Sequence, residues 1–314
     1  MAATDSEARP HSGTWAESFA LMGTALTIRV VGTAGEEVLR ESIHRAVRVM
    51  RAVEAACTRF DLDSPASQLG QTPGQWLSVP PPLFHALAIA LEVAELTEGR
   101  FDPTVGARME ELGFNRNYLT GLQVTHGISS RDPVSYHDIR LDPEGYRAFV
   151  DRPMVIDLGA VAKGLAVDLA ASELAGLDGF AIDAGGDVLV SGVDRDGNPW
   201  QVGIENPVIP GALLDLVSLS SGAVCTSGPL KSRSPADPRF HHLLNPVTGL
   251  SVSGLLSCTV VAPETVLADV IATAAYLMGP DQALSFIEDM GLAGMVVTEN
   301  REVLRTRAME RHRC

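Results

Sequence analysis

Apolar residues recur three or four positions apart in several stretches of the chain, and this spacing predicts helices. In residues 37–57 the apolar positions fall on one face, as in an amphipathic helix. Residues 83–97 are apolar on more than one face and are followed by Gly99, which predicts a buried helix closed by a glycine. Further helices are predicted from about residue 161 to 176, around Asp269, and over residues 281–290.

Short apolar or alternating runs predict strands between these helices. They cover residues 24–31, 138–141, 148–150, 180–190, 200–205, 213–219, 223–225, 255–262 and 294–298. Residues 114–153 are otherwise poor in periodicity and rich in turn formers. Strands interleaved with a few helices indicate an α+β fold with mixed or antiparallel sheets. No linker composition divides the chain, so we treat it as one unit.

One predicted strand is interrupted by the sequence Asp183-Ala-Gly-Gly-Asp187. Paired glycines inside a strand pattern mark a bulge or a close approach of backbone or ligand. The same sequence is equally compatible with a hairpin turn, so both interpretations stay open at this point.

The composition places the chain among globular proteins, with 46% hydrophobic and 20% charged residues over 314 positions. The net charge of −15 argues against nucleic acid or an anionic membrane surface as a partner. An anionic ligand would therefore need local cations. No apolar run approaches the ~20 residues that a membrane-spanning helix needs.

The cysteines are widely separated and form no Cys-x-x-Cys pair, which argues against a zinc site or a redox dithiol. We expect buried or free thiols in a reducing compartment. The N-terminal residues 1–13 contain no apolar signal core and no lipobox-like cysteine, so a cytoplasmic location is expected. The four cysteines are Cys57, Cys225, Cys258 and Cys314.

Candidate metal chemistry lies on the alanine-rich helix near the C-terminus. Asp269 and Thr273 are four residues apart, so a helix presents their oxygens on the same face. Mg²⁺ accepts such hard oxygen donors and keeps its other positions for water or phosphate. The alternative is a carboxylate that favours the helix N-terminus and an ordinary core threonine.

A candidate anion site lies earlier, in the sequence between Asp157 and Asp168. A β-branched run ends at Asp157, a glycine follows, and a helix that carries Lys163 begins. Free backbone N–H groups at a helix start, together with a lysine, favour an anion. The spacing is neither that of a P-loop nor that of a dinucleotide fingerprint.

Eight short motifs in this order resemble those of the ApbE family, the FAD:protein FMN transferases, from about residue 20 to about residue 300. The motifs are Leu21-Met-Gly-Thr24, Arg59-Phe-Asp-Leu-Asp-Ser64, Gly99-Arg-Phe-Asp-Pro-Thr-Val-Gly106, Asp157-Leu-Gly-Ala-Val-Ala-Lys-Gly164, Asp183-Ala-Gly-Gly-Asp187, Cys225-Thr-Ser-Gly228, His242-Leu-Leu-Asn-Pro-Val-Thr-Gly249 and Ala268-Asp-Val-Ile-Ala-Thr273. The resemblance implies a T-fold-related α+β body with the flavin in a cleft between two lobes. We expect a flexible segment at 1–18, one catalytic domain at 19–306, and a basic, solvated tail at 307–314.

The reaction that the resemblance implies is attack by a threonine hydroxyl on the FMN-side phosphorus of FAD, with release of AMP. The threonine belongs to a separate acceptor protein, because the chain has no obvious acceptor motif of its own. Mg²⁺, with Mn²⁺ as the alternative, is implied as the metal, on Asp269, Thr273 and the backbone carbonyl of Ala160. Two other functions stay open: hydrolysis of FAD to FMN and AMP, and FAD binding without catalysis.

Flavin contacts carried over by the resemblance have physical reasons and structural alternatives. Aromatic and thioether side chains can pack on a ring, carboxylates can accept from imide or sugar groups, and a lysine can meet phosphate. Core packing is the alternative for the two apolar side chains Met22 and Phe60, and capping is the alternative for the two aspartates. The contacts are Met22, Phe60, Arg100, Phe101, Asp102, Asp157, Lys163 and the backbone at Leu244.

His242 begins the motif that the resemblance assigns to catalysis. Its imidazole is suited to take the proton of the incoming hydroxyl, or to orient that hydroxyl. A buried structural histidine is the alternative. Neighbouring His241 would point to the opposite face of a strand, and the motif register favours His242.

The chain departs from the family pattern at two places. Asn245 stands where aspartate is usual, which keeps an acceptor and removes a charge. Gln68, within Ser67-Gln-Leu-Gly70, stands where arginine is usual, and this removes a cation from a predicted loop near the site.

Overall fold

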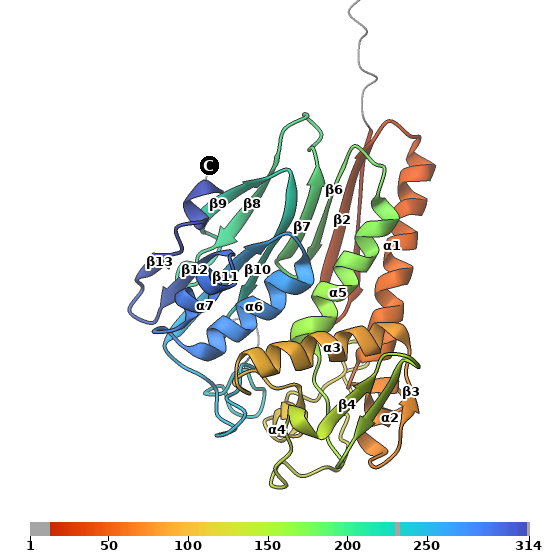
Figure 1. Cartoon of the computed structure of the whole chain (residues 1–314). Coiled ribbons are helices and arrows are strands. Elements are labelled where there is room, and N and C mark those ends of the chain that lie inside the picture. Colours follow the sequence, from red (N-terminus) through yellow and green to blue (C-terminus); the bar gives the residue numbers. More distant parts are fainter. Residues whose placement is uncertain (1–12, 230–232, 313–314) are drawn as a thin grey trace, which may run out of the picture.

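An eight-stranded antiparallel sheet forms the centre of the molecule (Figure 1). The structure is a computed structural model that describes residues 13–229 and 233–312. Every neighbouring pair of strands in the large sheet is antiparallel. In spatial order the strands are β1 (Gly13–Leu21), β2 (Thr24–Gly32), β6 (Gly179–Ala184), β7 (Asp187–Gly192), β10 (Ser221–Ser227), β11 (Leu255–Ala262), β12 (Ala293–Thr298) and β13 (Val303–Arg305).

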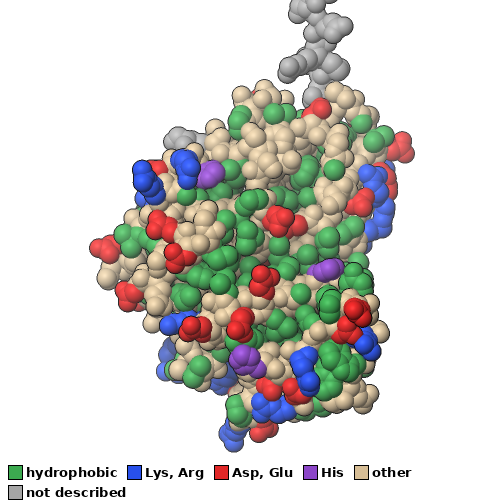
Figure 2. Space-filling model, in the orientation of Figure 1, with side chains coloured by type: hydrophobic (Ala, Val, Ile, Leu, Met, Phe, Trp, Pro, Cys, Tyr) green, Lys and Arg blue, Asp and Glu red, His purple; other side chains and the backbone are tan. Residues whose placement is uncertain are grey.

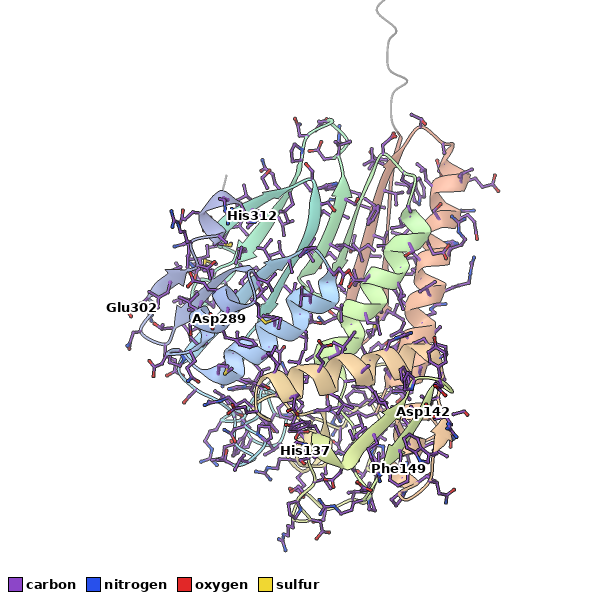
Figure 3. The ribbon with its side chains drawn as sticks, viewed as in Figure 1. His137, Asp142, Phe149, Asp289, Glu302 and His312 are labelled. Carbon is purple, nitrogen blue, oxygen red and sulfur yellow. The ribbon has the colours of Figure 1, made fainter. Side chains whose placement is uncertain are left out.

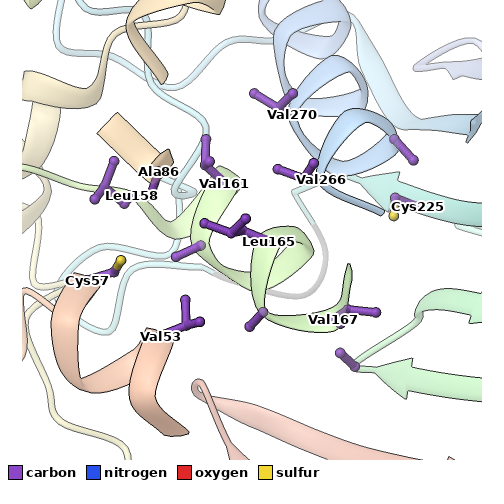
Figure 4. Packing of buried hydrophobic residues seen from close by; sticks show 14 of the residues in the cluster. Val53, Cys57, Ala86, Leu158, Val161, Leu165, Val167, Cys225, Val266 and Val270 are labelled. Carbon is purple, nitrogen blue, oxygen red and sulfur yellow. The ribbon is translucent and has the colours of Figure 1, made fainter. Parts of the chain in front are cut away.

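Helices cover one face of this sheet. Their apolar faces form the main core, in which large side chains such as Ile43, Met50 and Tyr276 are fully buried. Figure 4 shows side chains of three helices meeting in this cluster, among them Val53, Leu165 and Val266. The helices are α1 (Glu36–Cys57), α3 (Pro81–Leu96), α5 (Gly159–Ala171), α6 (Thr265–Met278) and α7 (Ala283–Asp289).

A hairpin of β8 (Trp200–Glu205) and β9 (Leu213–Leu219) forms a separate two-stranded sheet with its own apolar cluster. In β8 every second residue is buried, as the period of a strand requires. Trp200 and Val202 pack there with Val190 and Val224 of the large sheet. Because those two residues belong to β7 and β10, the hairpin shields the face of the large sheet that the helices leave free.

A smaller part of the molecule lies at one end of the helical layer, at the lower end in Figure 1. It holds a three-stranded antiparallel sheet in the order β3 (Leu77–Ser78), β5 (Arg147–Val150) and β4 (Ile139–Asp142). The short helices α2 (Pro65–Gln71) and α4 (Gly106–Glu111) belong to the same part. Figure 3 places Phe149 of β5 and His137 there.

Helices α5 and α6 are in close contact because a glycine lies between them. A Cβ on Gly164 would stand 2.5 Å from the Cα of Val266 and 2.8 Å from the carbonyl oxygen of Thr265. The start of α6 has no capping side chain of its own. Instead both carboxylate oxygens of Asp168 on α5 accept from the N–H groups of Thr265 and Val266, each at 2.8 Å. One helix thus caps the other, and their register is fixed.

Replacement of Gly164 by alanine should lower the free energy of unfolding by about 1 kcal/mol. Overpacking costs about 1–3 kcal/mol, which outweighs the ~1 kcal/mol that alanine gains over glycine in a helix. Gly35→Ala is the control, since a Cβ there meets nothing within 4 Å. Urea unfolding of both variants measures the difference, and an equal stability for the two would contradict the close approach of α5 and α6.

The predicted element types are largely confirmed, and the paired glycines prove to be a hairpin turn. Residues 180–190 are two strands, β6 and β7, joined at Gly185 and Gly186. Gly185 is in the left-handed region at φ 70°, and a Cβ there would lie 2.1 Å from Thr24 Oγ1. The backbone turn therefore packs directly against β2.

Two predicted terminal segments need correction. The flexible segment at 1–18 is wrong for residues 13–18, which pair with β2 as part of β1; residues 1–12 lie outside the described residues. The predicted solvated tail is wrong for Met309, which is fully buried. The carbonyl of His312 also accepts from Ser218 N at 2.9 Å, and Figure 3 shows His312 beside β9.

The chain is acidic overall, but its acidic side chains do not form one continuous patch on the face shown in Figure 2. Figure 2 shows acidic and basic side chains interspersed with hydrophobic ones over the face in view. Within residues 13–229 and 233–312, no helix combines the length and the apolarity that crossing a membrane would require.

Candidate active site

A cavity of about 740 Å³ lies where the helical layer meets the smaller part of the molecule. Its walls come from the β1–β2 turn, the end of α1, the start of α5, the β6–β7 turn, the end of β10, and α6. Segments far apart in sequence therefore converge on one space. The predicted site residues that line it are Met22, Phe60, Phe101, Asp102, Asp157, Ala160, Lys163, His242, Leu244, Asp269 and Thr273.

Arg100 is the predicted contact that the structure does not bring to this cavity. Its side chain is exposed, and the residue is absent from the lining, although Phe101 and Asp102 belong to it. The flavin contact of Arg100 stays a prediction, and the ligand-free cavity does not include its side chain. Phe101 is buried in the main core, whereas the neighbouring Arg100 side chain is exposed.

A buried lysine between two carboxylates forms the charged part of the cavity. Lys163 Nζ donates to Asp269 Oδ2 at 2.7 Å and to Asp187 Oδ2. Asp187 Oδ1 accepts in addition from Thr226 N at 3.0 Å. Despite desolvation, the two carboxylates raise the pKa of Lys163 above its usual range, so the lysine is charged.

Burial, partly opposed by Lys163 and reinforced by Asp187, raises the pKa of Asp269 to about 7. Burial makes ionisation of this carboxyl unfavourable, and a further cation beside it would stabilise the ionised form. The stabilisation that a cation would give the ionised Asp269 carboxylate is the first feature of the cavity that fits a divalent metal.

The donor atoms near this cluster are hard oxygens. Asp269 and Thr273 both lie on α6 and face the cavity, as their spacing predicts, and Ala160 lies in the first turn of α5. Thr273 Oγ1 is 2.8 Å from Ser227 Oγ, which orients the hydroxyl. No group of three or more His, Cys, Asp or Glu side chains within the described residues could form a metal cage. One carboxylate, one hydroxyl and one carbonyl fit a cation that keeps positions for phosphate.

The turn before α5 is held by a second ion pair. Asp157 Oδ2 accepts from Arg59 Nε at 2.5 Å, and Oδ1 accepts from Gly159 N at 2.9 Å. Burial would raise the pKa of Asp157, but the Arg59 charge, the Gly159 N–H and the charge of His242 together hold it below its usual value. Asp157 is thus ionised, and its environment couples it to the predicted catalytic histidine.

Met22, Phe60 and Tyr118 line the apolar side of the cavity. Hydrogen bonds and a cation–ring contact position these residues. Met22 is in the left-handed region at φ 53°, and its N–H donates to Glu54 Oε1 at 2.8 Å. The hydroxyl of Tyr118 donates to the same oxygen, also at 2.8 Å. Phe60 is half-buried, and the Arg59 guanidinium lies 4.3 Å from the centre of its ring. Glu54 therefore joins two walls of the cavity.

Asp102 lines the cavity and also has the capping role that was the structural alternative to a flavin contact. Its Oδ1 accepts from the N–H and the hydroxyl of Thr104, and its Oδ2 accepts from Tyr136 N. Burial raises the pKa of Asp102 in spite of these hydrogen bonds. Phe101 beside it is 5% exposed and belongs to the main core.

The two neighbouring histidines have different surroundings. His241 is buried, its Nε2 lies 2.9 Å from the carbonyl of Val252, and its ring meets Tyr276 edge-on. Burial lowers the pKa of His241, which keeps this imidazole neutral. His242 is half-buried and lines the cavity, whereas His241 does not. The geometry therefore agrees with the choice of His242 over His241.

Both departures from the family pattern lie outside this cavity. Asn245 Oδ1 accepts from the N–H groups of Val247 and Thr248 and shapes a turn, a role that needs an acceptor and no charge. It borders a second cavity of about 760 Å³, which shares Asp102, Val105 and Leu244 with the first. Gln68 lies on α2, not in the predicted loop, and its exposed side chain lines neither cavity.

Sequence reasoning assigned no role to four residues that the structure brings to the cavity. Asp187 accepts from Lys163, and Ser227 is hydrogen-bonded to Thr273. Arg59 pairs with Asp157, and Glu54 accepts from the Met22 N–H. Asp187, Ser227 and Arg59 fall inside the motifs of the family resemblance, and this was the available signal. Glu54 lies in a helix without a distinguishing neighbour, so only the tertiary structure reveals it.

Cysteine alkylation should be very slow at three positions of the folded protein. Cys57, Cys225 and Cys258 are free and buried; burial raises the pKa of Cys57 and of Cys258 to about 12 and that of Cys225 well above its usual value. At pH 8 the thiolate fraction of Cys57 is then roughly 1000-fold below that of an ordinary thiol. Iodoacetamide labelling with mass spectrometry, before and after unfolding, measures this, and rapid native labelling of Cys57 would contradict its burial.

A cavity that combines hard oxygens, a lysine and aromatic walls suits a ligand with both phosphates and a planar ring. The fold and this cavity together define an α+β protein whose candidate ligand site has one charged and one apolar part. The sequence model of the ApbE family matches residues 22–296, and the chain belongs to the ApbE family.

Relatives and solved structures agree with this assignment. A protein of Haemophilus influenzae named FAD:protein FMN transferase is 28% identical over 289 residues, which cover 87% of this chain and 83% of the relative. One of Vibrio cholerae with the same name is 27% identical and covers 85% and 82%. The crystal structure of the ApbE protein from Thermotoga maritima superimposes with a TM-score of 0.85 at 28% identity and covers 96% of this chain and all of the other. The predicted family and the α+β fold class are confirmed.

Proposed function

We propose that the protein transfers FMN from FAD to a threonine hydroxyl of a separate acceptor protein and releases AMP. The convergence of all predicted site residues except Arg100 on one cavity carries this proposal. The relatives named FAD:protein FMN transferase support flavin transfer as the reaction type. The threonine acceptor and the metal go beyond what the names of the relatives say, and each is tested by the carrier experiment.

The residues of the charged part are suited to a diphosphate. Lys163 can exchange one carboxylate partner for a phosphate oxygen and still keep the other, so its charge never lacks a partner. Asp269, Thr273 and the Ala160 carbonyl would hold Mg²⁺ or Mn²⁺. When bound, such an ion would neutralise charge on the diphosphate and on the leaving AMP.

The transfer itself breaks one P–O bond of the diphosphate and forms one bond from the acceptor oxygen to the FMN phosphorus. His242 would take the proton of the threonine hydroxyl, since it lines the same cavity and a neutral imidazole can accept a proton. Asp157 would favour the protonated imidazole that results, because the interaction between these two charges is favourable. The AMP phosphate carries away the electron pair of the broken bond.

Incubation with FAD, Mg²⁺ and a carrier protein that contains a flavinylation threonine tests the proposal. A fluorescent carrier band after denaturing electrophoresis is the expected result, and a carrier with valine in place of that threonine should give no band. Parallel reactions with Mn²⁺ and with a chelator define the metal. AMP release without a carrier band would overturn transfer in favour of hydrolysis. Binding of FAD without AMP release would show a binding protein.

A further inference from the structure

Two turns that border the cavities have the same sequence pattern and the same hydrogen bonds. They are Asn117-Tyr-Leu-Thr-Gly-Leu122 and Asn245-Pro-Val-Thr-Gly-Leu250, called the paired turns below. In each, the N–H of the asparagine donates to the carbonyl of the final leucine, and the N–H of the glycine donates to the carbonyl of the asparagine, at 2.8–2.9 Å. The asparagine Oδ1 accepts from the N–H groups of the third and fourth residues. Asn245, the departure from the family pattern, thus has the same role as Asn117.

Each of the paired turns is also anchored to the protein beneath it. Asn117 Nδ2 donates to the carbonyl of Phe60 at 3.2 Å. Arg108 Nε donates to the carbonyl of Gly249 at 2.9 Å. The internal bonds and these anchors hold the turns in one conformation, so their outer side chains are presented in fixed positions.

Those outer side chains are large, apolar and exposed. Leu119 and Leu122 of the first turn are 68% and 67% exposed, and Val247 and Leu250 of the second are 92% and 50% exposed. Single exposed apolar residues are common on protein surfaces, but grouped ones mark sites of interaction. Two apolar pairs on two rigid turns of the same build therefore indicate a surface that a partner covers.

The position of the paired turns identifies that partner. Leu119 lines the cavity that contains the proposed catalytic histidine, and Val247 lines the second cavity. The two cavities adjoin, because Leu244 and two further residues line both. The second turn begins only three residues after His242. A protein segment that brings a hydroxyl to His242 would therefore pass beside these side chains.

The charges of the second cavity define the partner further. Glu98 and Asp132 line it and are exposed, and within residues 13–229 and 233–312 neither carboxylate forms an ion pair. Arg108, in the same lining, already pairs with Glu111. Complementary charge at an interface favours the correct partner and its register. A lysine or arginine on the partner would complement this lining.

We propose that the paired turns are the docking surface for the acceptor protein. Their apolar side chains pack on apolar residues that flank the target threonine, and Glu98 and Asp132 meet a cation of the same segment. The inference rests on the proposed function, since it needs a separate acceptor, and it adds the surface that selects this acceptor. Flavin binding does not depend on the outer side chains of the turns.

Binding of a carrier that cannot react tests the docking surface apart from the chemistry. The probe is the carrier protein with valine in place of its flavinylation threonine, titrated by calorimetry into the FAD-saturated protein. Leu122→Ser and Val247→Ser should each weaken carrier binding about tenfold, as expected for an apolar anchor of an interface. The double variant should lose more than either. FAD affinity and melting temperature should stay as in the unaltered protein, because both positions are exposed.

Ile209→Ser is the matched control. Ile209 is 57% exposed, lies in a turn that begins with an asparagine, and lines neither cavity. Its carrier affinity should equal that of the unaltered protein. With the threonine carrier as substrate, the KM for the carrier should rise in the Leu122 and Val247 variants, and kcat should stay unchanged.

The charged part of the surface has its own variant. Glu98→Gln combined with Asp132→Asn should weaken carrier binding about three- to tenfold and reduce its dependence on salt. Unchanged affinity in this variant would overturn the predicted cation on the acceptor.

Three results would overturn the docking surface. Unchanged carrier affinity and KM in the double variant would show that the paired turns do not meet the acceptor. An equal loss in Ile209→Ser would show that the loss does not arise at these turns, and a parallel loss of FAD affinity would assign them to the flavin site. Carrier binding that the double variant weakens, without FMN transfer by the unaltered protein, would instead remove the proposed function and keep the docking surface.

Discussion

Replacement of Asp269 by alanine should reduce FMN transfer by about 1000-fold and leave the fold intact. A metal ion that neutralises phosphoryl charge is worth several kcal/mol of barrier, and 4 kcal/mol is roughly 1000-fold in rate. The proposed ion would lose its carboxylate ligand in this variant. The fold should tolerate the change, because Lys163 keeps Asp187 as its partner and is not left as an unpaired buried charge.

Carrier fluorescence and AMP release measure the loss, and thermal unfolding checks the fold. Asp289→Ala is a matched control at an exposed position near the end of α7, labelled in Figure 3, and it should have full activity. Full activity of the Asp269→Ala variant would remove the metal assignment. Asp269→Asn keeps the side-chain shape and should also be slow, since an amide oxygen lacks the charge that the cation requires.

Replacement of His242 by alanine should slow transfer by about 100- to 10,000-fold, the usual range for a general base. FAD affinity should change by no more than a factor of about two, because the base acts on the acceptor hydroxyl and contributes little to ground-state binding. Single-turnover rates at saturating FAD separate the chemical step from binding. Equal losses in rate and in FAD affinity would make His242 a binding residue.

His241 supplies the control for this experiment. Its imidazole is bonded to the Val252 carbonyl and packs on Tyr276, away from the cavity. His241→Gln should therefore lower the melting temperature and leave the transfer rate of the folded molecules near that of the unaltered protein. A slow transfer rate with an unchanged melting temperature in His241→Gln would instead make His241 the catalytic histidine.

Local patterns predicted those features that depend on local geometry. The spacing of Asp269 and Thr273 correctly placed both on the cavity side of one helix, because the helical period alone sets that relation. The strands from 200–205, 213–219 and 255–262 were predicted with the bounds that the structure shows, since each is an apolar run between clear turns. The motifs that carry the family resemblance predicted which segments converge, but not how.

Tertiary contacts account for what the sequence did not show. Asp187 is a partner of Lys163 only because the β6–β7 turn meets α5 in the folded chain, and no local pattern encodes that meeting. No sequence pattern indicated that Arg59 is buried, because only the fold places it against Asp157. β1 was missed because its apolar and polar residues do not alternate regularly, and as an edge strand it is mostly half-exposed or exposed.

The cap that Asp168 of α5 provides for α6 has a consequence for ligand affinity. Ala160 and Lys163 lie on one of these helices, and Asp269 and Thr273 lie on the other. Because the two helices are locked in register, these donors keep their mutual spacing before any ligand arrives. The conformational entropy of arranging them is lost during folding and does not have to be lost again on association. Preorganised donors of this kind favour tight, selective capture of a diphosphate by a chain whose overall charge would repel one.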